Sequence, residues 1–442
     1  MLLVAVLAPF LVLATGVTAH PKIPNAIRNT PNSVPFSKQI NVTGDLSPVH
    51  KDLIRLKNIG HDIVKGVHHI VNDVHHILKG DHRFNASTSH AREENPAPEL
   101  GLSDVVMGYV AKVGVGNPPT YYSLMVDTGR AVTWVGANTP YQKTNTSVSN
   151  FEVVIEGSGT VFVYGILYND TVTISPGIAI SQQPIGVSDI SAGIYPLDGV
   201  LGLGPKGLSY DTLAKNTSVI PTVTDNLFEQ GTIEQNLVAM SFEPNSNSTS
   251  AINGELTFGA TDRTKYTGNI SYFPLTKTPP ASRYWGVDAS FQYGGANGSA
   301  SVNILDTNAG IIDTGTTLIY LSTDAYQRYV NATGAALNET MGPGWLYMTP
   351  AQYEKLPPLS FNIGNSTFEL TPNAQIWPRE LNSAIRGADD VIYLVIHSLG
   401  DSSPGVDFVC GMAFLERFYT VFDTGNSRIG LAPTPFTNAE TN

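Results

Sequence analysis

The chain has 442 residues, of which 14% are charged, with 41 glycines, 29 prolines and a formal net charge of −12. This length exceeds what one compact core accommodates, so two domains with appended segments are expected. The acidic balance argues against nucleic acid as a partner, because such binding depends on basic contacts to phosphate. Abundant β-branched residues between frequent glycines and prolines favour an all-β protein.

Residues 1–19 form an apolar stretch that ends in small residues, and we interpret them as a secretory signal peptide. No later run reaches about 18 apolar residues, so no membrane span is expected. The sequence also carries eleven Asn-X-Ser/Thr sequons, which support export. They begin at Asn41, Asn85, Asn145, Asn169, Asn216, Asn247, Asn269, Asn297, Asn331, Asn338 and Asn365. The sequence therefore predicts a secreted, extracellular glycoprotein.

Residues 20–95 differ from the rest, because nine of the ten histidines fall here, with ten basic and seven acidic residues. The remaining chain is strongly acidic. Apolar residues at spacings of three and four from Ile63 to Ile77 predict an amphipathic helix. Its Val-His-His-Ile motif, at 67–70, recurs at 74–77. These histidines fit a pro-segment that titrates near neutral pH, a solvated helix face, or, less well at a seven-residue spacing, metal ligands.

The boundary of this segment falls between about Arg83 and Leu100, where Glu94-Asn95-Pro96-Ala97-Pro98 has the composition of an exposed linker. No dibasic pair lies there, so self-cleavage or another protease is expected to remove the segment.

The single cysteine, Cys410, excludes an internal disulfide. It lies in an apolar run and is expected to be a buried structural thiol.

The candidate catalytic residues lie in two copies of one sequence motif, an apolar run that ends in Asp-Thr-Gly. The copies are Asp127-Thr128-Gly129 and Asp313-Thr314-Gly315. Such a phrase places a carboxylate on a tight turn at the end of a strand, where Gly permits close backbone approach and Thr can hold the turn through its side-chain oxygen. Two such turns meeting face to face would let two carboxylates share one proton and activate water.

Each half also carries a later apolar-Gly segment, which indicates internal duplication. The first is 199–204 and the second 408–411. With these features the chain resembles the pepsin-like aspartic proteases, and most the secreted fungal polyporopepsin group. The matching phrases run from about Leu100 to Pro435: Val126-Asp127-Thr128-Gly129 with Trp134-Val135-Gly136, Ile220 to Leu227, Gly254 to Ala260, Asp313 to Thr317 and Phe414 to Tyr419, with Asn41-Val42-Thr43-Gly44 in the pro-segment.

The resemblance implies a bilobal fold with two pseudo-symmetric β lobes, at 96–270 and 271–442, an interlobe cleft, and a partly helical pro-segment at 20–95. It implies that Asp127 and Asp313 form a catalytic dyad. The positions expected to contact substrate are Gly129, Glu156, Gly157, Ser158, Gly315 and Thr316. The implied partners are polypeptide substrates and the chain's own pro-segment, and the protein is expected to be a monomer. No metal and no organic cofactor is implied.

Two departures from the family pattern lie where the chemistry should occur. Arg130 and Ala131 follow the first Asp-Thr-Gly, where the family has Ser, whereas the second site keeps its hydroxyl at Thr316. Glu156 stands where the family places the flap Tyr, if Gly157-Ser158-Gly159 is aligned with the flap. An alternative alignment puts Tyr164-Gly165 at the flap tip.

A cation beside Asp127 and an anion above it suggest that Arg130 and Glu156 approach one another, with a shifted pH optimum as the result. Trp134, which resembles the partner of the flap Tyr hydroxyl, would lose that partner. A third Asp-Thr-Gly begins at Asp423, where the family has a non-catalytic strand, so it is not expected to be catalytic.

The leading interpretation is a secreted aspartic endopeptidase zymogen that acts at acidic pH. The rival is a secreted peptide- or protein-binding protein with a protease fold and little or no catalysis, for which Arg130 and Glu156 are the evidence. Retention of both Asp residues and of Thr316 argues for hydrolysis.

Overall fold

The structure is a computed structural model that describes residues 33–43, 48–57, 104–158, 161–210, 212–214, 218–244, 252–295, 301–338, 341, 344–400 and 404–442. The predicted signal peptide, the histidine-rich helix over 63–77 and the predicted cleavage region lie outside the described residues. The described part of residues 20–95 forms strand β1 (Ser33–Thr43) and helix α1 (Pro48–Lys57). The predicted helix was at 63–77, and α1 was not predicted, although Val49, Leu53 and Leu56 have helical spacing.

Strands dominate the described body, which confirms the predicted all-β class. The first half contains β2 (Asp104–Val115), β3 (Thr120–Asp127), β4 (Trp134–Val135), β5 (Val148–Ser158), β6 (Val161–Ser175), β7 (Ile178–Ala192), β8 (Gly199–Gly202), η2 (Lys206–Ser209), α3 (Val223–Glu229), β9 (Leu237–Phe242) and β10 (Ile252–Phe258). These strands belong to one 13-stranded sheet, ordered β11-β23-β22-β9-β10-β1-β2-β3-β8-β4-β7-β6-β5.

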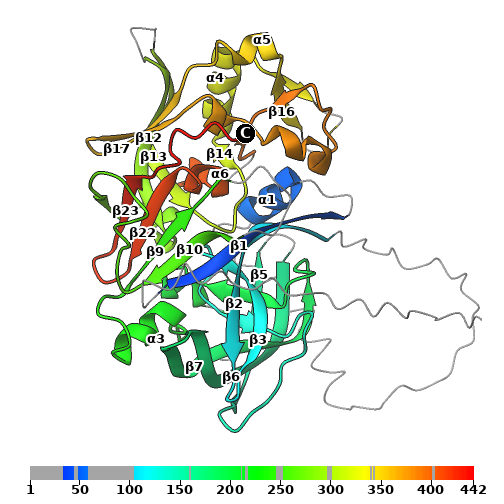
Figure 1. Cartoon of the computed structure of the whole chain (residues 1–442), viewed down its shortest axis with the longest axis vertical. Coiled ribbons are helices and arrows are strands. Elements are labelled where there is room, and N and C mark those ends of the chain that lie inside the picture. The colour runs from blue at the N-terminus through cyan, green and yellow to red at the C-terminus, as the bar shows by residue number, and fades with distance from the viewer. Residues whose placement is uncertain are drawn as a thin grey trace, which may run out of the picture.

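The second half forms the upper part of the molecule in Figure 1. It contains β11 (Ser271–Pro274), η3 (Ala281–Arg283), β12 (Gly286–Gly294), β13 (Ser301–Ile312), β14 (Ile319–Leu321), α4 (Thr323–Thr333), β15 (Ala336–Asn338), β16 (Trp345–Met348), α5 (Pro350–Tyr353), β17 (Leu359–Ile363), β18 (Ser366–Leu370), η5 (Asn373–Gln375), η6 (Arg379–Ile385), β19 (Ile392–Tyr393), β20 (Ile396–Ser398), β21 (Phe408–Cys410), α6 (Met412–Leu415), β22 (Phe418–Asp423) and β23 (Arg428–Pro433). A seven-stranded sheet, β18-β17-β12-β13-β21-β14-β20, forms its core, while β11, β22 and β23 join the large sheet.

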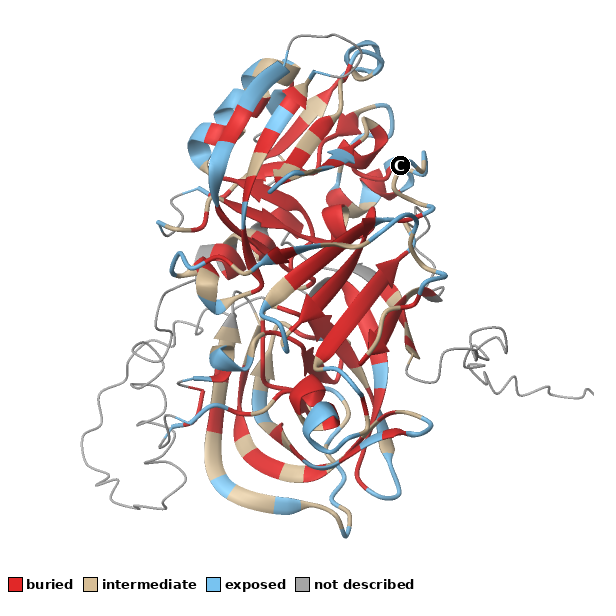
Figure 2. Cartoon of the chain, turned by 90° about the vertical axis from the view of Figure 1, so that its left-hand side faces the viewer, coloured by how far each residue is buried: buried red, intermediate tan, exposed pale blue. Residues whose placement is uncertain are grey.

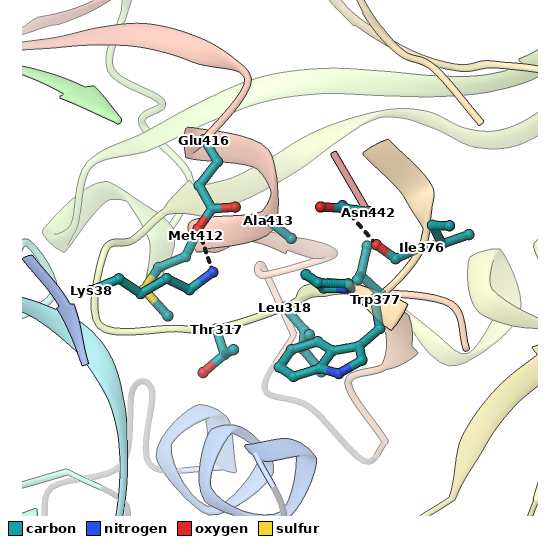
Figure 3. A pocket seen from close by; sticks show the side chains of 11 residues that line it. Lys38, Thr317, Leu318, Ile376, Trp377, Met412, Ala413, Glu416 and Asn442 are labelled. Carbon is teal, nitrogen blue, oxygen red and sulfur yellow. Dashed lines mark hydrogen bonds and ion pairs between the residues drawn. The ribbon is translucent and has the colours of Figure 1, made fainter. Parts of the chain in front are cut away.

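Strand β1 lies inside the large sheet, between β10 and β2, and crosses the middle of the molecule beside α1 (Figure 1). Its Phe36 ring packs against the rings of Tyr109 and Phe242, with centroids 4.9 Å and 5.1 Å away. The buried Lys38 ammonium lies 2.6 Å from a Glu416 carboxylate oxygen, at the edge of a pocket formed with the second half (Figure 3). Strand β1 is therefore packed as part of the core.

Both halves use the same local arrangement around Asp-Thr-Gly, as the duplicated sequence predicted. Strand β3 ends at Asp127 and pairs in parallel with β8, and β13 pairs in parallel with β21. In the first half, Gly202 lies directly under the loop that follows Asp127. A Cβ at this position would be 2.6 Å from the carbonyl carbon of Ala131. In the second half, a Cβ at Gly411 would collide with the carbonyl oxygen of Thr316, so Gly202 and Gly411 each make room for the loop that carries the carboxylate.

Buried residues fill the central strands of both halves (Figure 2). Cys410 ends β21 in this region, fully buried, and burial raises the pKa of its thiol. This confirms the expected structural thiol, because a neutral, inaccessible thiol is a poor nucleophile.

We predict that Gly202→Ala lowers the free energy of unfolding by about 1–3 kcal/mol, because the backbone carbonyl groups of Ala131 and Val132 must move. Gly207→Ala is the matched control, since a Cβ there has open space around it. Urea unfolding followed by tryptophan fluorescence measures both variants. Equal stability of the two variants would contradict the close packing described for Gly202.

Candidate active site

The two Asp-Thr-Gly loops meet at the contact between the halves and hold one another through their threonines. The Thr128 amide donates to Thr314 Oγ1 at 2.9 Å, and the Thr314 amide donates to Thr128 Oγ1 at 2.9 Å. Thr314 Oγ1 also donates to the Val126 carbonyl. The expectation that each Thr would hold its own turn was wrong: each hydroxyl binds the opposite turn, and so fixes the two carboxylates face to face.

Each carboxylate accepts a hydrogen bond from the glycine amide of its own loop. The Gly129 amide donates to Asp127 Oδ1 at 2.9 Å, and the Gly315 amide donates to Asp313 Oδ1 at 3.1 Å. Both side chains are buried. The structure therefore brings together Asp127, Asp313, Gly129 and Gly315, four of the residues that the sequence singled out.

The second oxygens of the two carboxylates have different partners. Thr316 Oγ1 donates to Asp313 Oδ2 at 2.6 Å, whereas Arg130 Nε lies 3.2 Å from Asp127 Oδ2. A hydroxyl thus faces one carboxylate and a cation faces the other. Burial opposes ionisation of Asp127, but Arg55, Arg130 and the Gly129 amide outweigh it and hold the pKa of Asp127 below its ordinary value.

Glu156 and Gly157 lie on β5, in the hairpin that β5 and β6 form over this region. A Glu156 carboxylate oxygen lies 3.5 Å from Arg130 Nη1, so the predicted approach of these two side chains is present. Burial raises the pKa of Glu156 to about 7, although Arg130 lowers it. Ser158 ends β5; its side chain and Gly159 are outside the described residues.

The position of the hairpin turn decides between the two flap alignments. The turn falls between Ser158 and Val161, so Tyr164 lies inside β6, where it pairs with Ile155. Gly165 lies against the Val187 carbonyl of β7, so it serves strand packing. This register favours the alignment that places Glu156 at the flap position. Trp134 Nε1 is buried without a hydrogen-bond partner among the described residues, in agreement with the loss expected from the missing Tyr.

One guanidinium, that of Arg55 on α1, bridges both carboxylates. Arg55 Nη2 lies 2.6 Å from Asp127 Oδ1 and 3.2 Å from Asp313 Oδ1. Nη1 lies 2.8 Å from Asp127 Oδ2, and Nε lies 3.1 Å from Asp313 Oδ2. A Cβ on either Gly129 or Gly315 would collide with this guanidinium, so the two glycines also make room for it. The space between the carboxylates is filled by the Arg55 guanidinium.

Asp52, one turn before Arg55, anchors α1 on the second half. Its Oδ2 accepts hydrogen bonds from the amides of Thr317 (3.0 Å) and Leu318 (3.2 Å) and from the Tyr320 hydroxyl (3.2 Å). Burial raises the pKa of Asp52 to about 7, although these amides lower it. Together Asp52 and Arg55 attach one face of a short helix to the loop that carries Asp313.

Sequence reasoning missed both Asp52 and Arg55. The pro-segment contains ten basic residues, and nothing in local sequence distinguishes Arg55 from the other nine. The available signal was the mildly basic charge of residues 20–95, which indicates that a cation from this segment could pair with the two aspartates. Only tertiary packing shows that this cation is Arg55.

Asp423, in the third Asp-Thr-Gly, lies elsewhere, at the end of β22. It accepts hydrogen bonds from Arg428 Nε at 2.7 Å and from the Asn426 amide at 3.1 Å. Within the described part of the chain, no group of three His, Cys, Asp or Glu side chains has the arrangement of a metal site. None of the described helices is both long and apolar enough to cross a membrane.

The fold and the paired Asp-Thr-Gly loops agree with comparison to known proteins. The model of the eukaryotic aspartyl protease family matches residues 108–434. The chain therefore belongs to this family and is an aspartic-type endopeptidase.

Polyporopepsin from Irpex lacteus is 51% identical over 348 residues, which cover 78% of this chain and 100% of that protein. Gastricsin from Cavia porcellus is 29% identical, covering 80% and 89% of the two chains. The crystal structure of an aspartic proteinase from Irpex lacteus superposes with a TM-score of 0.72 at 51% identity, over 76% of this chain and 96% of that one.

We predict that Arg55→Ala destabilises the full-length chain at neutral pH by about 3 kcal/mol, because two buried carboxylates lose their shared cation. A carboxylate whose pKa is lowered in the folded state stabilises above its ordinary pKa, and this contribution is lost as pH falls through the lowered value. The difference between wild type and variant should therefore be largest near pH 7 and shrink below about pH 4.

Urea unfolding at several pH values measures this difference. Arg55→Lys is the matched variant: it keeps the charge but cannot span four oxygens, so intermediate stability is expected. A difference that does not change with pH would contradict an electrostatic role for Arg55.

Proposed function

We propose that the chain is the secreted zymogen of an acid-acting aspartic endopeptidase, in which Asp127 and Asp313 activate water and the pro-segment blocks them. The single observation that carries this proposal is the Arg55 guanidinium, within 3.2 Å of oxygens on both carboxylates. A cation that occupies the space between two carboxylates excludes a water and a peptide from the same space.

In the active form, the pair of carboxylates shares one proton and holds a water. The ionised member takes a proton from the water, and the oxygen of the water attacks the scissile carbonyl carbon. The protonated member donates its proton to the carbonyl oxygen, giving a neutral tetrahedral intermediate. Transfer of a proton to the amide nitrogen then allows the carbon–nitrogen bond to break, releasing a carboxylic acid and an amine. No metal or cofactor is required by these steps.

The flap residues and the loop glycines are the proposed contacts to substrate. Gly157 and Ser158 follow Glu156 at the end of β5, and Glu156 is linked to Asp127 through Arg130. Gly129 and Gly315 leave backbone accessible beside the reacting atoms once Arg55 departs, and Thr316 orients Asp313. A polypeptide in extended conformation fits this arrangement, since a strand edge offers backbone donors and acceptors at regular spacing.

Acidification is the proposed trigger for opening. Protonation of Asp127 removes the charge that holds Arg55, so docking of α1 weakens as pH falls through the lowered pKa of Asp127. Asp52 acts in the opposite sense: its pKa is raised, so burying it is least costly when it is protonated, below its ordinary pKa. Asp52 therefore keeps α1 docked during mild acidification. Release of α1 requires the lower pH at which Asp127 is protonated.

Export is supported by the sequons as well as by the apolar N-terminus. The side chains of Asn145, Asn269, Asn331 and Asn365 are exposed, as glycan attachment requires.

The test is peptide hydrolysis by the acid-treated chain from about pH 2.5 to 7, beside Asp127→Asn and Asp313→Asn variants and with a statine-type inhibitor. Cleavage that either variant and the inhibitor abolish is the expected result, because each removes the shared-proton chemistry. A folded, processed chain that cleaves nothing at any pH would overturn the proposal and favour a peptide-binding role.

A second measurement tests the block by Arg55. In the full-length chain, Arg55→Ala should expose activity or begin self-processing at a higher pH than wild type, because the dyad no longer has to release a cation. Arg428→Ala is the control: its ion pair with Asp423 (2.7 Å) joins β23 to β22, so its onset pH should equal that of wild type. An unchanged onset in Arg55→Ala would contradict the block.

A further inference from the structure

Arg130 joins the first carboxylate to both strands of the flap hairpin. Its Nε lies 3.2 Å from Asp127 Oδ2, its Nη1 lies 3.5 Å from Glu156 Oε2 on β5, and its Nη2 donates to the Val161 carbonyl on β6 at 3.4 Å. The side chain is 2% exposed and Glu156 is 9% exposed. Three ionisable groups thus form a buried row of alternating charge, from the flap to the reacting oxygen.

This row faces only one of the two carboxylates. Asp313 has a neutral hydroxyl, that of Thr316, in the corresponding position. A fixed cation favours the ionised form of the carboxylate beside it, whereas a hydroxyl has a weaker preference. When Arg55 leaves with the pro-segment, Arg130 becomes the cation that remains against the pair, and it remains on one side.

The other charged or titratable groups around this row come from α1 and from the second half. They are Arg55, Asp313, Tyr284 and Arg283. Burial raises the pKa of Tyr284, so this phenol stays neutral over the working range. After Arg55 departs, the charges that matter are therefore those of Arg130, Glu156 and the two aspartates.

We propose that Arg130 is a positioning residue that keeps Asp127 the ionised member of the pair and leaves the shared proton on Asp313, while Glu156 balances the charge of Arg130 from the flap. The inference rests on the proposed function, since it assigns roles within that dyad. Asp127 is then the group that takes the proton from water, and Asp313 the group that donates to the carbonyl oxygen.

The two substituted residues act in different parts of the pH range. In acid, Glu156 is neutral, because burial raises its pKa to about 7, and Arg130 acts on Asp127 without opposition. Towards neutral pH, Glu156 ionises and offsets the charge of Arg130, which favours retention of the proton that the pair shares. Arg130 therefore keeps the acid limb of the pH profile at low pH, and Glu156 keeps the basic limb at higher pH.

The experiment measures kcat/KM against pH for the acid-processed enzyme and three variants. Arg130→Ser should move the acid limb to higher pH by about one unit, as expected for loss of a cation in contact with a carboxylate. Glu156→Gln, which keeps shape and removes charge, should leave the acid limb in place and move the basic limb to lower pH. Arg428→Ser, which removes a cation paired with Asp423, is the control and should match wild type.

Arg130→Lys keeps a cation at this position, so its acid limb should lie closer to that of wild type than to that of Arg130→Ser. If Arg130→Ser does not fold, Glu156→Gln and Arg130→Lys still test the inference. Lower kcat or higher KM with both limbs unmoved would mean that Arg130 and Glu156 only hold the flap, and would overturn it. Absence of any cleavage by the wild-type enzyme would instead overturn the proposed function.

Discussion

Two buried carboxylates held face to face need compensating charge, and much of the described molecule is arranged around that requirement. Burying an ionised group without a partner is costly, so each aspartate has a full set of hydrogen-bond donors. The crossed hydrogen bonds of Thr128 and Thr314 fix the separation of the two loops, which come from different halves. Each half holds its own carboxylate through a glycine amide, and the two carboxylates come together where the halves meet.

The pro-segment meets the same requirement from outside the body. Arg55 supplies a charge to both aspartates, Asp52 binds the loop beside Asp313, and Lys38 neutralises Glu416 under the large sheet. Strand β1 adds backbone pairing on both of its edges. These contacts make the described residues of the segment an integral layer of the fold, with β1 paired to both β2 and β10.

Arg130 and Glu156 give the site an asymmetry that the duplicated fold does not have. In each half an Asp-Thr-Gly loop ends beside a glycine of the paired strand, and the backbone arrangements correspond closely. The difference lies in one side chain per loop: Thr316 in the second half and Arg130 in the first. A long buried cation reaches the flap as well as the carboxylate, so charge, flap position and protonation become linked at one residue.

The sequence by itself determined the β class, the duplication, the two Asp-Thr-Gly loops and the neighbouring positions of Arg130 and Glu156. These follow from local patterns, namely strand periodicity, turn residues and motif spacing, which act over a few residues. Tertiary structure decided that the threonines bind across to the opposite loop, that α1 forms, and that Arg55 reaches both aspartates. Asp127 and Arg55 are 72 residues apart, and Asp313 and Arg55 are 258 apart. Contacts at such separations depend on the packing of whole elements. The residues next to Arg55 in the sequence therefore do not show that this side chain, among the ten basic side chains of 20–95, is the one that reaches the aspartates.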